Sequence, residues 1–209
     1  MTVMGLVAKD TGTTYEPPPA GNHVARCVSL IDIGMQPNEY QGVSKPRLEV
    51  IIGWELPNEM MDAEDGQQPQ PYRISRFITN TLCDMGNLRP LLESWRGKAF
   101  TNAELEGFDL TNIVGKPCMV NVVHKQKVKG GIRAEVTGVT PIPKGLKCPP
   151  QVHPTIIFDC DNIDREVYDG FSDGMKKIVD RRIIDAGGGE DNPGGYATEI
   201  PKDDDIPFD

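Results

Sequence analysis

Aromatic side chains are scarce in this 209-residue chain and make up 6% of it, so an aromatic residue in a polar setting is informative. The five cysteines and three histidines are scattered, and no CxxC pair occurs. No metal-ligand spacing results, and free thiols in a reducing cytosol are expected. Because the sequence contains neither a signal peptide nor an apolar run long enough to cross a membrane, we predict a cytoplasmic protein.

Motifs of known catalytic chemistry are also missing. We find no nucleophile motif, no HExxH and no phosphate-binding loop, because the glycines of residues 187–195 have no strand before them and no helix after them. Asp159, Asp161 and Asp164 form a loose carboxylate cluster that could hold Mg²⁺, but it lacks the glycine and the closing glutamate of a calcium loop. We expect no enzyme activity, no metal and no other cofactor; a carboxylate-dependent nuclease is the alternative that this cluster raises.

The charge that is present is unevenly distributed. The formal net charge is −9. Residues 185–209 contain eight acidic residues against one lysine, a net charge of −7, whereas residues 20–147 contain 15 basic residues against 14 acidic ones, a net charge of +1. Because local charge governs binding, the acidic total does not exclude a nucleic-acid ligand.

The pattern of apolar residues predicts strands at 23–34, 46–56, 72–79, 116–126 and 131–141. Alternation in the second of these places five side chains on one face: Leu48, Val50, Ile52, Trp54 and Leu56.

A helical region is predicted at about residues 87–107, with an interruption at Gly97 and a capping box formed by Thr101 and Glu104. Three strands, a helix and two strands are the element order of the OB-fold, a five-stranded Greek-key barrel with a helix between strands 3 and 4. We therefore predict a mainly β OB-fold, an order of elements that other small α+β folds share.

This fold prediction divides the chain into four parts. Residues 1–19 are expected to be a flexible N-terminal arm, and residues 20–141 the OB-fold domain. Residues 142–184 are expected to be an extended connector followed by an amphipathic helix within 168–182, which would pack on the barrel or serve a partner. Residues 185–209 are predicted to be a disordered acidic tail.

OB-folds hold single-stranded nucleic acid on the face of strands 2 and 3 and on the loops between strands 1–2 and 4–5, with basic grooves and aromatic platforms. The predicted loop between strands 4 and 5 contains the densest basic stretch, with no acid before Glu135. Its candidate DNA-binding residues are Lys125, Lys127, Lys129 and Arg133. An ordinary solvated hairpin tip is the alternative interpretation.

The third strand supplies four further candidates: Tyr72, Arg73, Arg76 and Phe77. Alternation cannot place Ile74, Phe77 and Ile78 all inside. An outward Phe77 would be a stacking platform beside Arg73, whereas an inward Phe77 would leave Arg76 on the open face. Tyr72 is expected to be half exposed, because its hydroxyl tolerates water.

The remaining aromatic candidates differ in their surroundings. Tyr40 lies in the polar loop between strands 1 and 2, and we predict that it stacks on a base. Trp54 is in phase with the apolar face of its strand, so we assign it to the core, and we expect Trp95 to pack its helix against the barrel.

The chain ends in PKDDDIPFD, an acidic segment that contains an isolated apolar group. A solubility tail gains nothing from an exposed isoleucine and phenylalanine, whereas a docking peptide would use its charges for steering and its phenylalanine to fill a pocket. The predicted protein-interaction residues are Asp203, Asp204, Asp205, Ile206, Pro207 and Phe208.

DDDIPF (203–208) resembles the acidic tip of bacterial single-stranded DNA-binding proteins, in which a linker ends in a hexapeptide that docks on replication and repair proteins. That family ends on the phenylalanine, whereas Asp209 follows it here. The stretches IDIGMQ (31–36), WELP (54–57), LLESWRGKAFT (91–101) and GKPCMVNVV (115–123) are similar to single-stranded DNA-binding proteins of tailed phages. The resemblance implies an OB-fold that coats single strands during phage replication, recombination and repair in the bacterial cytoplasm.

Two interpretations of different classes follow. The first is a non-catalytic protein that binds single-stranded DNA, with possible self-association along the strand and with a tail that recruits replication and repair proteins. That tail could also compete with DNA for the basic groove, since a tethered polyanion has a high effective concentration there. The alternative is a protein-interaction adaptor of the replication machinery whose barrel binds protein.

Overall fold

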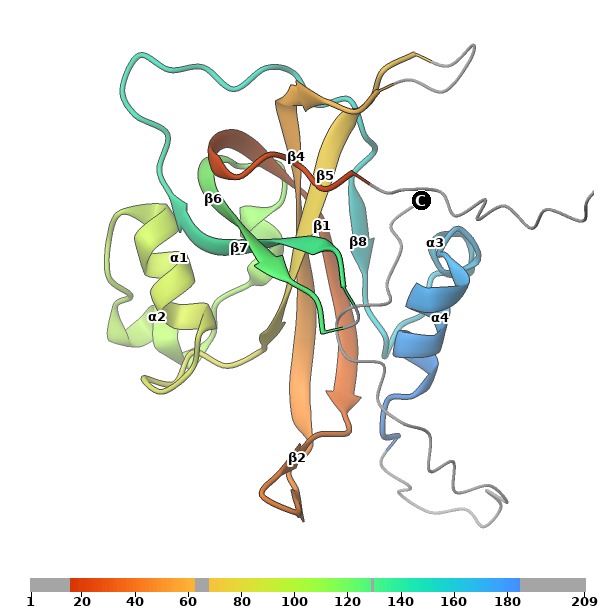
Figure 1. The fold of residues 1–209 in the computed structure, drawn as a ribbon. Coiled ribbons are helices and arrows are strands. Elements are labelled where there is room, and N and C mark those ends of the chain that lie inside the picture. Colours follow the sequence, from red (N-terminus) through yellow and green to blue (C-terminus); the bar gives the residue numbers. More distant parts are fainter. Residues whose placement is uncertain (1–15, 63–67, 129, 185–209) are drawn as a thin grey trace, which may run out of the picture.

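The computed structural model describes residues 16–62, 68–128 and 130–184, and within them the fold is mainly β (Figure 1). The main sheet contains six strands, β1 (Gly21–Gln36), β4 (Arg47–Met60), β5 (Pro71–Thr79), β6 (Pro117–Gln126), β7 (Ile132–Thr140) and β8 (Ile156–Phe158). A separate hairpin consists of β2 (Glu39–Tyr40) and β3 (Val43–Ser44). The helices are α1 (Leu88–Arg96), α2 (Asn102–Glu106), α3 (Arg165–Asp169) and α4 (Asp173–Asp180), with the 3₁₀ turn η1 (Leu110–Ile113).

The five long strands follow the order β5-β4-β1-β6-β7, and all their neighbouring pairs are antiparallel. β8 joins parallel to β1 at Ser29–Ile31, beyond the segment Gly21–Arg26 that pairs with β6, so this part of β1 lies between β8 and β4. The ends of this order, β5 and β7, approach to within 8 Å between Cα atoms but do not pair in the described residues. Because no strand pairing joins β5 to β7 there, the sheet is not closed into a barrel. None of the described helices is long and apolar enough to span a membrane.

The main core lies on the inner face of this sheet. Four of the five residues predicted to share a face of the second long strand, Val50, Ile52, Trp54 and Leu56, are buried there, as alternation requires. Leu48, the fifth of them, is 46% exposed and pairs with Met35 near the end of β1. Trp54 and Trp95 belong to this core as predicted, with ring centroids 6.1 Å apart.

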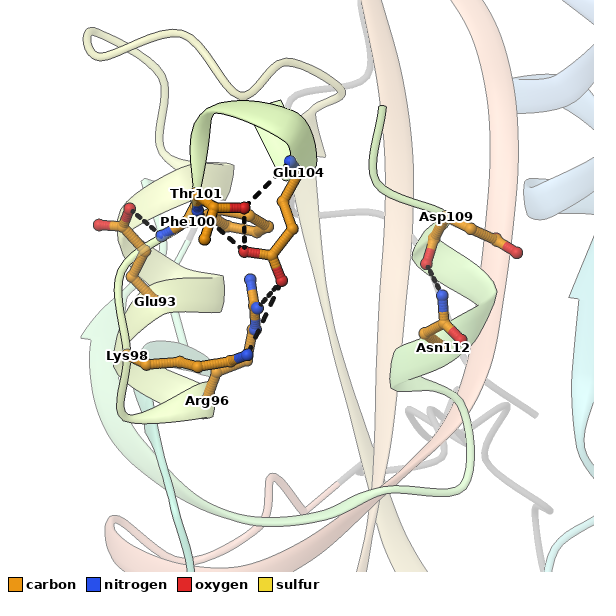
Figure 2. Close-up of polar contacts among 8 residues, drawn as sticks. All are labelled: Glu93, Arg96, Lys98, Phe100, Thr101, Glu104, Asp109 and Asn112. Atoms are coloured by element: carbon orange, nitrogen blue, oxygen red, sulfur yellow. Dashed lines mark hydrogen bonds and ion pairs between the residues drawn. The ribbon is translucent and has the colours of Figure 1, made fainter. Parts of the chain in front are cut away.

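The predicted helical region is confirmed, including its interruption. α1 ends at Gly97, which has φ 67°, a left-handed conformation that glycine adopts without steric cost. Thr101 and Glu104 form the predicted capping box at the start of α2 (Figure 2). The Glu104 carboxylate also accepts a hydrogen bond from Arg96, which ties α1 to α2. Together they cover the inner core, and Figure 1 shows them on the side of the sheet opposite α3 and α4.

A second apolar cluster covers the outer face of the sheet. A register shift between Cys27 and Ser29 turns Ile31 and Ile33 outward, where they join Ile51. β8 and α4 pack on these residues, and α4 buries Met175, Ile178 and Val179. The predicted amphipathic helix therefore packs back on the sheet, although it spans only Asp173–Asp180.

The connector between β7 and β8 is fastened to the sheet by two charged side chains. Glu55 has no exposed surface and accepts hydrogen bonds from the backbone N–H groups of Val152, at 3.1 Å, and His153, at 2.7 Å. The ring nitrogen Nδ1 of His153 lies 2.6 Å from the same carboxylate. Arg26 donates to the carbonyl oxygens of Gly115 and Pro149. These bonds fix the position at which the chain returns to the outer face.

Candidate nucleic-acid interface

The β2–β3 hairpin carries the most exposed of the predicted aromatic residues. Gln41 and Gly42 both have positive φ, 52° and 75°, as a two-residue type I′ turn requires. The turn pairs Tyr40 with Val43, and Tyr40 is 54% exposed, as its predicted stacking role needs. Lys45 Nζ lies 5.7 Å from the centroid of the Tyr40 ring. The hairpin therefore presents an aromatic face and a cation together.

The β6–β7 hairpin is less basic than its sequence indicates. Lys125 pairs with Arg133 across the hairpin, and both contact the carboxylate of Glu135. Lys125 Nζ lies 2.8 Å and Arg133 Nη2 lies 3.5 Å from Glu135 Oε2. Lys127 lies in the turn, where its N–H donates to the Gly131 carbonyl oxygen. Lys129, the remaining candidate of this loop, lies outside the described residues.

Tyr72 is not half exposed: only 7% of it is accessible, and it belongs to the inner core. Burial is the first cause of the raised pKa of its hydroxyl. The prediction that Tyr72 is half exposed, and so available to stack on a base, was wrong because the strand start is covered by its neighbours on the inner face. A tyrosine after a polar loop gives no local sign of that cover.

The alternatives for the rest of β5 are decided by its register. Arg76 pairs with Ile52 of the inner core, and Phe77 pairs with Ile51 of the outer cluster. Phe77 therefore points to the outer face, together with Arg73, but it packs against the outer cluster and is half-buried. An outward Phe77 does not become an open platform, because the C-terminal helices occupy that face. Arg76 is half-buried.

The carboxylates of residues 159–164 do not gather as one site. Asp164 instead caps α3, accepting from the N–H groups of Glu166 and Val167. Asp159 lies near Asp32 and the buried Cys160, with ligand atoms within 4.8 Å of one another. Burial raises the pKa of the Cys160 thiol to about 11, and burial is also the first cause of the raised pKa of Asp32.

A cleft of about 100 Å³ opens between the outer face of the sheet and the C-terminal segment. Its floor is a row of three small residues in register across β1, β4 and β5, namely Ser29, Gly53 and Ser75. His153 and Ile156 line it from the connector and β8, and Phe171 lines it from the turn between α3 and α4. Arg73, a predicted site residue, also lines it. It lies two residues before Ser75 in β5 and therefore on the same face of the sheet.

Sequence reasoning missed this cleft, although one signal pointed to it. Gly53 interrupts an apolar strand, and an isolated glycine in a strand marks a close approach. A Cβ atom on Gly53 would lie 2.2 Å from Ser29 Oγ, so the glycine is required by the neighbouring strand. The walls come from distant parts of the chain, which no local pattern reveals.

The described residues contain 19 basic and 20 acidic side chains, a net charge of −1, so any affinity for a polyanion must come from local groups such as these hairpins. The predicted tail residues 203–208 lie outside the described residues.

In comparisons with known proteins, no family model matches the chain and no curated protein matches it.

Proposed function

We propose that this protein binds single-stranded DNA without sequence specificity and without catalysis, and that its fold is a five-stranded OB barrel with a C-terminal extension. The strand order supports the fold. Numbered along the chain, the five long strands lie in the sheet in the order third, second, first, fourth, fifth (β5-β4-β1-β6-β7), and α1 and α2 lie between the third and the fourth in sequence. That is the arrangement of an OB-fold, in which the third and fifth strands meet. The approach of β5 to β7 agrees with it.

The observation that carries the proposal is the placement of the two hairpins. β2–β3 joins the first two long strands and β6–β7 contains the last two, and these are the loops that flank an OB-fold binding site. Tyr40 offers an accessible ring on one, and the other carries Lys127 and Lys125, of which Lys125 is paired with Glu135. A base stacked on an aromatic ring contributes about 1–3 kcal/mol, and the cations attract the backbone.

The proposed biological role follows from the resemblance of the sequence to single-stranded DNA-binding proteins of phages and bacteria. The protein would coat and protect single strands during phage DNA replication, recombination and repair in the bacterial cytoplasm, and could associate with itself along the strand. The tail, residues 203–208, would recruit host replication and repair proteins and compete with DNA for the basic loop. A variant that ends at Ile184 should then bind DNA more tightly; unchanged affinity would count against the competition.

The experiment is a titration of a labelled oligo-dT by fluorescence anisotropy at several salt concentrations. Replacing Lys125 and Lys127 with glutamine should weaken binding and reduce the magnitude of the log–log salt slope by about 1.4, because each lysine that neutralises a phosphate of a single strand adds about 0.7 to it. The matched control replaces Lys144 and Lys147, two exposed lysines of the connector, and changes the net charge equally. Equal weakening by both pairs would show that net charge, not the hairpin, determines affinity. If the unaltered protein fails to bind at low salt, the proposal is wrong and the adaptor function takes its place.

A further inference from the structure

The floor of the cleft on the outer face consists of small residues. Ser29, Gly53 and Ser75 lie side by side on three neighbouring strands, so no side chain longer than serine rises from this row. The next row on one side contains Ile31, Ile51 and Phe77, which the C-terminal helices cover. The row on the other side contains Glu55, which the connector covers. The small residues therefore leave a gap between two covered rows.

Two hydroxyl groups on the floor of this gap are left without a hydrogen bond within the described part of the chain. Neither the Ser29 hydroxyl nor the Ser75 hydroxyl makes a hydrogen bond to the residues that the structure describes, although both line the cleft. A hydroxyl can donate and accept, so two of them can meet the edges of different bases. Phe171 supplies an aromatic wall and Arg73 a permanent positive charge.

We propose that this cleft holds one unstacked base of the bound strand and that it prefers the single ring of a pyrimidine. The inference rests on the proposed function. A cavity of about 150 Å³ holds a benzene molecule, so about 100 Å³ with an open side suits one six-membered ring whose sugar remains outside. The larger double ring of a purine would protrude. The base edge meets Ser29 and Ser75, Phe171 contacts the ring, and Arg73 faces the adjoining phosphate.

A nucleobase fits this chemistry better than a peptide does. The cleft is too small for a row of side chains, and Arg73 and the uncharged hydroxyls suit a neutral heterocycle joined to an anion. The cleft is also bounded by the C-terminal segment, so its ligand contacts the extension and the sheet at once. Binding of DNA would therefore stabilise the packing of α3 and α4 on the sheet.

The test fills the cleft and compares strands of different base. Ser75→Leu places a branched side chain on the floor, and Thr79→Leu, on the same strand and face but outside the cleft, is the matched control. The ligands are oligo-dT, oligo-dA and an abasic strand of equal length. The unaltered protein should bind oligo-dT at least about fivefold more tightly than the abasic strand, the lower bound for one base contact. It should also bind oligo-dT more tightly than oligo-dA. Ser75→Leu should remove this preference for the pyrimidine and Thr79→Leu should retain it, while stacking on Tyr40 leaves both variants tighter on oligo-dT than on the abasic strand.

The outcomes separate the two proposals. If no strand binds to the unaltered protein, the proposed function fails. If all strands bind equally, or if Ser75→Leu keeps the preference for oligo-dT over oligo-dA, the cleft does not hold a base, and DNA binding still stands. Thermal unfolding of both variants checks the fold. If Ser75→Leu unfolds, Ser75→Val replaces it, because valine is smaller, is favoured in strands and lacks the hydroxyl. Ser75→Val should reduce the preference for oligo-dT in the same assay.

Discussion

Glu55 is the residue whose replacement should reveal how firmly the C-terminal segment is held. Its carboxylate is fully buried and accepts hydrogen bonds from two consecutive residues of the connector, Val152 and His153. Its Cα register partners on the neighbouring strands are Arg26 and Arg73. The wall of the cleft thus depends on one side chain of the sheet.

Replacing Glu55 with glutamine preserves the size of the side chain and changes its chemistry. One oxygen remains as an acceptor, while the new amide group points a donor at backbone N–H donors. Hydrogen bonds to charged groups contribute about 1.5–3 kcal/mol, and a buried donor without a partner costs about 1–3 kcal/mol. We expect the free energy of unfolding to fall by about 3 kcal/mol, measured by urea denaturation followed by tryptophan fluorescence.

Glu59 provides a matched control on the same strand. It also pairs with a histidine, because its Oε1 lies 3.0 Å from Nδ1 of His23, but its side chain is 31% exposed. Exposed ion pairs contribute about 0–1 kcal/mol, so Glu59→Gln should change stability little. If Glu55→Gln costs no more than Glu59→Gln, the connector is not held through Glu55, and the assignment of the cleft wall to His153 loses its basis.

Three other predictions use simpler measurements. Tyr40→Ala should weaken binding of oligo-dT by about 5- to 150-fold, the equivalent of one stacked base, and Tyr40→Phe should not; similar titrations for both would exclude stacking. The pKa of Asp32 is raised above its ordinary value of 3.8, first by burial and then by Asp159 and Asp161, so its contribution to stability is lost as the pH rises from 3.8 through the folded-state pKa. Asp32→Asn should therefore unfold at a higher temperature than the parent at pH 7, by a margin that shrinks toward about pH 4; a constant margin would contradict this. Burial raises the pKa of Cys27 to about 12 and that of Cys160 to about 11, whereas Cys83 is exposed, so a thiol reagent at mildly alkaline pH should modify Cys83 first; rapid modification of Cys27 or Cys160 would show that these sites open.

Local patterns predicted the inner half of this fold well. The alternation of Val50, Ile52 and Trp54 determines which face of β4 is buried, and the pair Thr101 and Glu104 marks the start of α2. Both are short-range effects, since a strand alternates by geometry and a capping box involves residues three apart. The order of the elements then limits the topology of the sheet.

The outer face could not be predicted in the same way. The sequence predicted an amphipathic helix within 168–182 but not where it packs, and its contact with Ile31 and Ile51 joins segments far apart in the chain. The same contact determines that Phe77 is covered. Glu135 was visible as the first acid after the basic stretch, but only the hairpin register shows that Lys125 and Arg133 share it.

The row of small residues on the cleft floor leads to a prediction that two substitutions are coupled. A Cβ atom at position 53 would lie 2.2 Å from Ser29 Oγ but 3.5 Å from Ser29 Cβ, an ordinary contact. Gly53→Ala must therefore displace the Ser29 hydroxyl, whereas in a protein that already carries Ser29→Ala the methyl group fits.

In that second background the alanine should stabilise the strand by about 0.5–1 kcal/mol, because glycine is unfavourable in strand interiors. In the presence of Ser29 the same change should be neutral or destabilising, so a double-mutant cycle in urea should give a coupling of about 1 kcal/mol or more. Additive effects would mean that Ser29 and Gly53 do not face each other, and that the register shift at Cys27 and Ser29, on which the whole outer face depends, is misplaced.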